Sequence, residues 1–567
     1  MLAPWWDRFP GRLDAELQAL ESAGIQCRRD ESAFSDGRLI FSLTMPEGAP
    51  VDTLVAKFPD TYPYTRVEVY APTTTLGRHQ NPFHKNLCLL GRGSENWHVT
   101  DTLAATLESQ LPQIFAAAAA PGLAEAAELE EPQGEPISVF YDCEPKSAVL
   151  VDSGWTIPPG ITSGRLQIGV ASWEPVRGAV LRITGDDDAV LASADPTWGR
   201  LYPERVTIRW ARLPEPLLEN NPERFFERLA RLDPHAVRET WQHDAHLLAV
   251  SFPEEVKWRA HADGWLFVVR RRGNQKGFRP GKRIRASFAR AERVGQIDLA
   301  VRLPSRLLMS ELTIAVVGLG CLGAPSLLEF ARAGVGGLRF LDRDSVEGGT
   351  IVRWPFGFGA IRYPKAEVLF KFIESEYPHT KLKGYVHHVG NPEQRDDDRD
   401  RRVLDDLLSG VDLVYDATAE LGLQQLFSDL AGERKIPYVC VSATHGGWGG
   451  IVARARHDGS TGCWVCLQQA LTNGTIPLPP ADPAGVIQPQ GCGALTFTGA
   501  NFDLGEVALM GVRFALATVC SRKDPSYGDY AWEVAVLRLR NDDGARIEPQ
   551  WQVFPLPANP QCSTCRV

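Results

Sequence analysis

The stretch TIAVVGLGCLGAPSLLEFARAGVGGLRFLDRD, from Thr313 to Asp344, decides the fold of the C-terminal half of this chain. It opens with Thr313–Val317, a short apolar and β-branched run that is typical of a buried parallel strand. Three glycines follow in G-x-G-x-x-G spacing: Gly318, Gly320 and Gly323. An amphipathic helical stretch then continues to Arg332, so we expect a strand, a glycine turn and a helix in succession.

This context predicts a nucleotide site. Glycines let the backbone approach a phosphate, and a helix N-terminus presents N–H groups to it. A second expected strand, Leu338–Leu341, ends in Asp342, whose carboxylate can bind ribose hydroxyls. The glycine turn alone does not say which nucleotide binds.

Length and composition limit the remaining possibilities. A chain of 567 residues is too long for one core, and two to four domains are expected. The formal charge of −10 argues against nucleic acid as a partner of the whole chain. The N-terminus has no signal-peptide pattern and no apolar run reaches the length of a membrane span, so we expect a cytoplasmic protein without a membrane partner. In a reducing cytoplasm we expect the eleven cysteines to be buried, metal-binding or catalytic rather than paired in disulfides.

The pattern of elements predicts a multidomain α/β and α+β protein with three parts. Residues 1–135 show the order of a small α+β domain, residues 136–305 a β-rich middle region, and residues 306–567 a Rossmann-like domain. A Pro- and acid-rich linker is expected at 128–136, and a helix at 222–232. The basic stretch 270–293 is typical of a solvated loop, with a docking patch for an acidic partner as the weaker alternative.

Cys88 stands out in the first part. It follows a loop that is rich in amide and imidazole groups: His79, Asn81, His84 and Asn86. Such groups can tune a thiolate or stabilise an oxyanion, which favours a nucleophile over a structural cysteine.

The same stretch resembles ubiquitin-conjugating (E2) enzymes. The features that match in order are FPDTYP at 58–63, His79-Gln-Asn-Pro82, Cys88 and Trp97. The resemblance implies a UBC-like α+β domain over residues 1–135, with Cys88 as the thioester-forming residue. The His-Pro-Asn sequence of that family is not intact, so the residue that stabilises the oxyanion is Asn81 or Asn86, or is absent.

Charged residues downstream of the glycine turn indicate phosphate chemistry rather than hydride transfer. Arg353 and Lys365 can neutralise phosphate charge. Asp416, which ends a third expected strand at 411–415, can hold Mg²⁺.

This part is similar to the ThiF/MoeB/ubiquitin-activating (E1) superfamily, whose members use ATP to adenylate the C-terminal carboxylate of a ubiquitin-like protein. The resemblance implies a ThiF/E1 adenylation domain at 306–567. It also implies a set of ATP- and Mg²⁺-binding residues: Gly318, Gly320, Gly323, Asp342, Asp344, Arg353, Lys365 and Asp416. Arg353 and Lys365 are in addition expected to act in catalysis. Thr350 stands where the family usually has asparagine.

Four further cysteines have the spacing of a zinc site. Cys463 and Cys466 form one C-x-x-C pair, and Cys562 and Cys565 form another. Each pair can supply two corners of a tetrahedral Zn²⁺, and four thiolates leave no open position, so we expect structural zinc. A redox dithiol is the alternative. The activating superfamily carries the same paired motif.

Cys492 lies in a Gly-, Pro- and Gln-rich loop just before a long helical stretch that begins near Leu504. A cysteine near a helix N-terminus tends toward the thiolate. Activating relatives that form a covalent intermediate carry their cysteine in this loop, which implies that Cys492 is catalytic.

Together these features predict a relay in which ATP activates a partner's C-terminal tail, Cys492 and then Cys88 carry it as thioesters, and a target lysine receives it. The fusion resembles the ligase of type II CBASS anti-phage operons, which implies a cGAS/DncV-like nucleotidyltransferase as the modifier. That resemblance also implies a homodimer through the adenylation domains. A β-grasp ubiquitin-like modifier is the alternative partner. The alternative functions are a sulfur-carrier adenylyltransferase, an NAD-dependent oxidoreductase and a non-catalytic scaffold.

Overall fold

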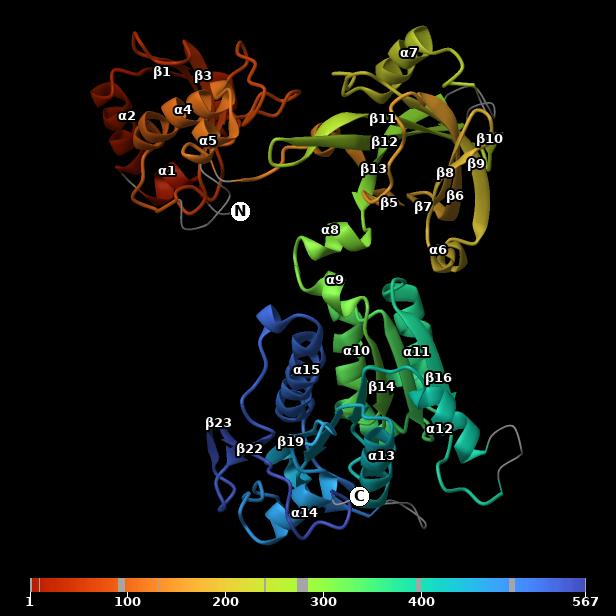
Figure 1. The fold of residues 1–567 in the computed structure, drawn as a ribbon. Coiled ribbons are helices and arrows are strands. Elements are labelled where there is room, and N and C mark those ends of the chain that lie inside the picture. The colour runs from red at the N-terminus through yellow and green to blue at the C-terminus, as the bar shows by residue number, and fades with distance from the viewer. Residues whose placement is uncertain are drawn as a thin grey trace. The chain divides into compact units, whose positions relative to one another are not determined.

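The computed structural model describes residues 3–9, 11–89, 97–130, 132–238, 241–272, 284–393, 399–488 and 495–565. The chain divides into two compact units, residues 1–293 and 294–567, which are drawn from red to blue along the chain in Figure 1. The three-part division with boundaries at 135 and 305 stays a prediction.

The beginning of the first unit is an α+β domain. Its helices are α1 (Trp5–Arg8), α2 (Arg12–Ser22), α3 (Glu31–Ser35), α4 (Leu103–Ala119) and α5 (Leu123–Ala127). An antiparallel meander runs in the order β1 (Gln26–Arg29), β2 (Leu39–Thr44), β3 (Thr53–Phe58) and β4 (Glu68–Tyr70). Alternate residues of β2 and β3 are buried, because one face of the sheet packs on the helices.

The rest of the first unit is a β-barrel. Its strands are β5 (Cys143–Val151), β6 (Ser163–Trp173), β7 (Val176–Gly185), β8 (Val190–Ser193), β9 (Glu204–Arg212), β10 (Trp241–Gln242), β11 (Ala245–Lys257), β12 (Ala260–Arg272) and β13 (Ile284–Arg293). The turn η2 (Ile137–Phe140) and the helices α6 (Pro196–Leu201) and α7 (Pro222–Leu232) accompany them. The described strands pair in the order β11-β12-β13-β5-β7-β6-β9, and β9 pairs with β11 to close the ring.

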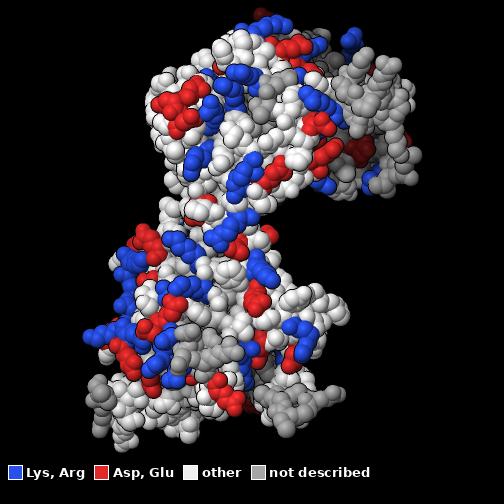
Figure 2. Space-filling view, turned by 90° about the vertical axis from the view of Figure 1, so that its right-hand side faces the viewer, with Lys and Arg blue, Asp and Glu red and all other residues white. Residues whose placement is uncertain are grey.

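The prediction of a solvated loop at 270–293 was wrong for the described residues of that stretch. Strand β13 lies between β12 and β5, with Phe288 and Ala289 fully buried. The arginines are engaged: Arg271 binds Glu144, and the guanidinium of Arg270 lies 3.9 Å from the Phe226 ring centroid. On the face of the molecule that Figure 2 draws, Lys and Arg side chains are interspersed with Asp and Glu side chains.

The second unit is an α/β domain. Its helices are α8 (Gln296–Ala300), α9 (Arg306–Met309), α10 (Gly323–Ala333), α11 (Lys365–Glu376), α12 (Asp400–Leu408), α13 (Leu421–Glu433), α14 (Trp464–Thr472) and α15 (Asn501–Lys523). Short 3-10 turns are η3 (Gly348–Val352), η4 (Phe358–Ala360), η6 (His445–Gly447) and η7 (Pro525–Tyr527).

The strands of this unit are β14 (Thr313–Val317), β15 (Gly337–Asp342), β16 (Lys381–Val386), β17 (Leu413–Asp416), β18 (Tyr438–Ala443), β19 (Gly449–Ala455), β22 (Val534–Arg540) and β23 (Arg546–Phe554). They form one sheet in the order β16-β15-β14-β17-β18-β19-β22-β23, parallel from β16 to β18. A separate ribbon pairs β20 (Val486–Ile487) with β21 (Thr496–Phe497). From β14 the chain first adds β15 and β16 on one side and then crosses over to add β17 and β18 on the other side. This change of side makes the end of β14 a topological switch point.

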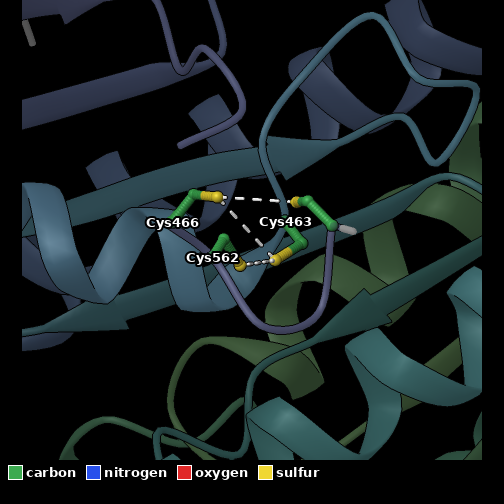
Figure 3. A group of neighbouring side chains, drawn as sticks. Cys463, Cys466 and Cys562 are labelled. Carbon is green, nitrogen blue, oxygen red and sulfur yellow. Dashed lines mark hydrogen bonds between the residues drawn. The ribbon is translucent and has the colours of Figure 1, made fainter. Parts of the chain in front are cut away.

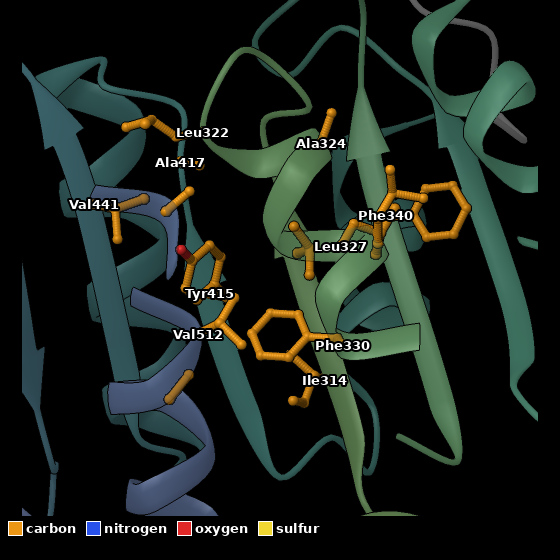
Figure 4. Close-up of a cluster of buried hydrophobic side chains, with 14 of the residues drawn as sticks. Ile314, Leu322, Ala324, Leu327, Phe330, Phe340, Tyr415, Ala417, Val441 and Val512 are labelled. Atoms are coloured by element: carbon orange, nitrogen blue, oxygen red, sulfur yellow. The ribbon is translucent and has the colours of Figure 1, made fainter. Parts of the chain in front are cut away.

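Each face of this sheet carries a core. Ile314 and Val316 face the cluster that includes α10 and α15, whereas Ala315 and Val317 face the cluster that includes α12, α13 and α14. Figure 4 shows the first cluster. Helix α15 has the length and hydropathy of a membrane span, but 67% of its apolar window is buried inside the protein, so it acts as a core helix of this unit.

Gly511 sets how closely α15 approaches the sheet. A Cβ at Gly511 would lie 2.3 Å from the hydroxyl of Tyr415, whereas a Cβ at Gly505 on the same helix meets nothing within 4 Å. We therefore expect Gly511→Ala to lower the free energy of unfolding of this unit by about 1–3 kcal/mol. Gly505→Ala should raise it by up to about 1 kcal/mol through helix propensity. Calorimetric unfolding of both variants checks this, and equal midpoints would contradict it.

Candidate functional site

The glycine turn closes tightly on itself. Gly318 has φ of +79°, and a Cβ at Gly323 would lie 1.8 Å from the Gly318 carbonyl oxygen. Gly320, in contrast, meets nothing within 4 Å on its Cβ side. Gly318 and Gly323 are therefore needed for the turn itself, while Gly320 has an open Cβ side just before the N-terminus of α10.

Asp342 joins the turn to the end of β15. Its Oδ2 accepts the N–H of Leu319 at 2.6 Å and its Oδ1 accepts the N–H of Asp344 at 2.6 Å. Burial raises the pKa of Asp342, and the charge of Lys365 opposes this rise. The carboxylate thus fixes the loop that contains the predicted ribose- and phosphate-binding residues.

Asp416 is fully buried at the end of β17. Its Oδ1 accepts from the N–H and hydroxyl of Thr418, and its Oδ2 accepts the hydroxyl of Tyr438 at 3.0 Å. Burial raises the pKa of Asp416 to about 6. In this arrangement the carboxylate orients the turn that packs on Gly318 and presents no exposed oxygen, which does not fit an Mg²⁺ ligand.

The two predicted phosphate-binding cations have protein partners. Lys365 Nζ lies 2.9 Å from Asp344 Oδ2. Arg353 donates to the hydroxyl of Thr496 at 2.6 Å and to the carbonyl of Phe497, and its guanidinium lies 4.6 Å from the Phe497 ring centroid. Arg353 therefore connects the loop after β15 to strand β21.

Two more residues singled out from the sequence are Thr350 and Cys492, and the structure describes only the first of them. Thr350 donates its hydroxyl to the carbonyl of Glu347 at 2.9 Å within η3, so it serves the local turn. Cys492 lies outside the described residues, between β20 and β21, and its catalytic role stays a prediction.

The four predicted zinc ligands converge. Their sulfur atoms all lie within 4.8 Å of one another, and Figure 3 labels three of them, Cys463, Cys466 and Cys562. The sulfur–sulfur distances are 4.0 Å from Cys463 to Cys466, 3.6 Å from Cys463 to Cys562 and 3.5 Å from Cys466 to Cys565. Zinc–sulfur bonds of about 2.3 Å in a tetrahedron put sulfurs about 3.8 Å apart, so the donor set fits a structural Zn²⁺.

In the first unit, Cys88 lies half-buried on an extended segment. Its N–H donates to the His79 carbonyl at 2.7 Å, and the preceding residue, Leu87, is buried. Since successive side chains of an extended chain point to opposite sides, Asn86 and Cys88 share the side away from the core. Asn81 Oδ1 instead accepts the N–H groups of Phe83 and His84 and caps their turn. Asn86 is therefore the better candidate for the oxyanion position.

Tyr62, Pro63 and Trp97, on which the predicted E2 resemblance also rests, lie in or against the core next to this segment. The hydroxyl of Tyr62 donates to the buried carboxylate of Glu16, which also accepts the N–H of Leu103 at 2.9 Å. Trp97 donates its indole N–H to the Pro63 carbonyl at 2.8 Å.

His79 lies between two carboxylates that sequence reasoning missed. Its Nε2 is 2.5 Å from Glu130 Oε2 and its Nδ1 is 3.2 Å from Glu135 Oε1. Burial lowers the pKa of His79, but the hydrogen bonds and charges of Glu135 and Glu130 outweigh it and raise the pKa. Both acids belong to residues 128–136, which the Pro- and acid-rich composition predicted to be a linker. No local sequence pattern distinguishes these two acids from the solvated acids of a linker.

Comparison with known proteins agrees with this geometry. Residues 297–521 match the ThiF family. The Sulfur carrier protein ThiS adenylyltransferase of Escherichia coli is 27% identical over 30% of this chain and 62% of that protein. The second unit thus carries the part of the chain that is similar to the ThiF family, and it includes the glycine turn, Asp342 and Asp416.

Two relatives match almost the entire chain. Uncharacterized protein y4oA of Sinorhizobium fredii is 32% identical over 99% of this chain and 97% of its own length. Uncharacterized protein y4qC of the same organism is 32% identical over 97% and 96%. The chain belongs to the family of y4oA and y4qC.

Metal removal provides a test of the cysteine cluster. We expect about one Zn²⁺ per chain by elemental analysis, and a lower unfolding midpoint after treatment with a strong chelator, because four thiolates would lose their common ligand. Cys562→Ser should lose the metal, whereas Cys27→Ser, in the first unit, should keep it. A disulfide within either C-x-x-C pair of the purified protein would instead favour the redox alternative.

The raised pKa of His79 predicts a pH-dependent stability. The imidazolium stabilises the fold fully below the unfolded-state pKa of about 6.5, and this contribution is lost as the pH rises through the higher folded pKa. The midpoint difference between the parent and His79→Asn should therefore shrink as the pH is raised above 6.5. His98→Asn, at an exposed histidine, serves as the control and should leave the pH profile unchanged. A constant parent–His79→Asn difference from pH 5.5 to 9 would contradict the assignment.

Proposed function

We propose that the chain is a two-cysteine ligase that activates the C-terminal carboxylate of a partner protein and attaches it to lysines of target proteins. One observation carries the proposal. A ThiF-family adenylation domain shares its polypeptide with an α+β domain whose half-buried Cys88 lies on the same side of an extended segment as Asn86. A carrier thiol beside an amide is what acyl transfer needs.

The first step takes place at the glycine turn. The triphosphate lies over the open side of Gly320 and the N-terminus of α10, and Asp342 contacts the ribose. The phosphates replace Asp344 as the partner of Lys365 and compete with strand β21 for Arg353. The partner's carboxylate attacks the α-phosphorus, and pyrophosphate leaves.

Three acyl transfers follow, each at the carbonyl carbon of the partner's C-terminus. The Cys492 thiolate displaces AMP, the Cys88 thiolate displaces Cys492, and a lysine amine displaces Cys88 to give an isopeptide while its proton passes to solvent. Carrying both cysteines on one chain raises the effective concentration for the second transfer. The four cysteines would hold Zn²⁺, which would supply structure only, and no step depends on Mg²⁺ at Asp416.

For the modifier we propose the C-terminal tail of a cGAS/DncV-like nucleotidyltransferase in cytoplasmic antiviral defence, with the ligase acting as a homodimer. The resemblance to type II CBASS ligases supports this choice, and a β-grasp ubiquitin-like protein is the alternative. The second candidate function is a sulfur-carrier adenylyltransferase, which the similarity to the ThiS adenylyltransferase favours. That function gives Cys88 no role.

The test combines pyrophosphate exchange with detection of reductant-sensitive adducts, using ATP, Mg²⁺ and a candidate modifier. Gly320→Ala should lower exchange about tenfold or more, equivalent to about 1.4 kcal/mol, because the added methyl group would occupy the space proposed for the phosphates. The unfolding midpoint should not change, because this Cβ meets no protein atom within 4 Å. Cys492→Ala should keep exchange and lose all adducts. Cys88→Ala should keep the Cys492 adduct and lose conjugates.

Cys27→Ala is the matched control and should behave as the parent. Adducts and conjugates that persist in both Cys88→Ala and Cys492→Ala would overturn the ligase. If pyrophosphate exchange and the Cys492 adduct are observed but no product depends on Cys88, the sulfur-carrier function is supported instead.

A further inference from the structure

The loop that precedes Cys88 is held by a buried group of charges. Arg78 Nε lies 3.2 Å from Glu130 Oε2, and its Nη1 binds Glu255 of strand β11. The neighbouring His79 contacts Glu130 and Glu135, as described above. The side chains of Glu130 and Glu135 are only 3% and 8% exposed. Three carboxylates thus surround two adjacent cationic residues of one loop.

The barrel inserts its β11–β12 turn into this group. Trp258 donates its indole N–H to Glu130 Oε1 at 2.9 Å, and Arg259 Nε donates to the same oxygen at 3.0 Å. The guanidinium of Arg259 also donates to the Ala117 and Ala120 carbonyls at the end of α4, at 2.8 and 3.0 Å. These partners lower the pKa of Glu130 to about 2 although burial opposes them. Glu130 is the shared acceptor of the loop and the barrel.

The other end of the loop also contacts the barrel domain. The Phe83 ring lies 4.9 Å from that of Tyr141, and His84 Nε2 lies 3.3 Å from Asp142 Oδ1. Asp142 is fixed in turn by Asn220, which donates its amide at 2.8 Å. Residues 78–84 are therefore bound at both ends by groups outside the α+β domain.

His79 connects these contacts to the nucleophile. Its backbone has φ of +61°, a left-handed conformation that is unfavourable for a residue with a Cβ and that its surroundings must therefore hold in place. The His79 N–H donates to Glu135 Oε2 at 2.8 Å, and its carbonyl accepts the Cys88 N–H at 2.7 Å. Glu135 and the Cys88 backbone therefore hold the same residue from its two sides.

We propose that Glu130, Glu135 and the Trp258–Arg259 turn form a clamp that positions Cys88 for acyl transfer, so that the barrel is a working part of the conjugating module. The inference rests on the proposed function of Cys88. Glu130 and Glu135 are positioning residues, because they act through His79 and not on the acyl group. A displaced nucleophile loses up to about 100-fold in rate per ångström, so a loosened clamp should slow transfer more than it lowers stability.

The test uses the full chain with Glu135→Gln, which keeps an acceptor oxygen, and Glu135→Ala, which does not. The matched control is Glu144→Gln, which breaks the pair with Arg271 in the same unit away from the Cys88 loop. Three quantities are measured: hydrogen exchange of peptides covering 84–89, alkylation of Cys88 by iodoacetamide followed by mass spectrometry from pH 6 to 9, and ATP-dependent acylation of Cys88.

Glu135→Ala should speed exchange of the Cys88 amide about tenfold or more, change the pH profile of Cys88 alkylation and slow acylation of Cys88 about 10- to 100-fold. Glu135→Gln should fall between Glu135→Ala and the parent. The Cys492 adduct should not change, and Glu144→Gln should behave as the parent in every assay.

Unchanged exchange, alkylation and acylation in folded Glu135→Ala would overturn the clamp. If Glu135→Ala does not fold, the same three assays on Glu135→Gln decide. A parent chain that never acylates Cys88 would overturn the ligase function, whereas the exchange and alkylation results would still decide the clamp.

Discussion

The close approach of the Gly318 carbonyl to Gly323 is the contact on which the second unit depends. It forces α10 to begin directly beyond β14, at the point where the sheet order reverses. Asp342 and Asp416 then accept backbone N–H groups from the turn and from its neighbour, so the ends of adjacent parallel strands are joined to the glycines. The position for a nucleotide follows from backbone geometry before any side chain contributes charge.

Local patterns predicted local structure well. Strand β14 and helix α7 have the expected bounds, because each is set by its own apolar run and end residues. The convergence of the four sulfurs was predicted correctly from the two C-x-x-C pairs, because such paired spacing is typical of tetrahedral zinc sites. Strand β13 was missed because its arginines hide an apolar face that only the neighbouring strands reveal. The roles of Glu130 and Glu135 could not be predicted, since their partners lie about 50 to 130 residues away and an acid-rich connector looks the same when it is solvated.

The buried charges of the first unit have an energetic logic. Taking ion pairs out of water costs about as much as their attraction returns, so apolar side chains would hold the α+β domain against the barrel at least as well. Charged hydrogen bonds differ from apolar packing in their directionality. Glu130 accepts hydrogen bonds from His79, Trp258 and Arg259. This group therefore selects one arrangement of the loop and adds little to the stability of the fold. The Glu16–Tyr62 contact does the same for the core beneath it.

The cysteine cluster has a topological consequence. Cys463 and Cys562 are 99 positions apart, so a shared ion would close the intervening backbone into a ring that contains α15 and the segment with Cys492. Closing a ring of this size removes unfolded-chain entropy worth roughly 4–5 kcal/mol in the loop-closure treatment used for cross-links. The same ring would include strands β22 and β23, so the ion would fasten the C-terminal end of the chain to the sheet that α14 covers.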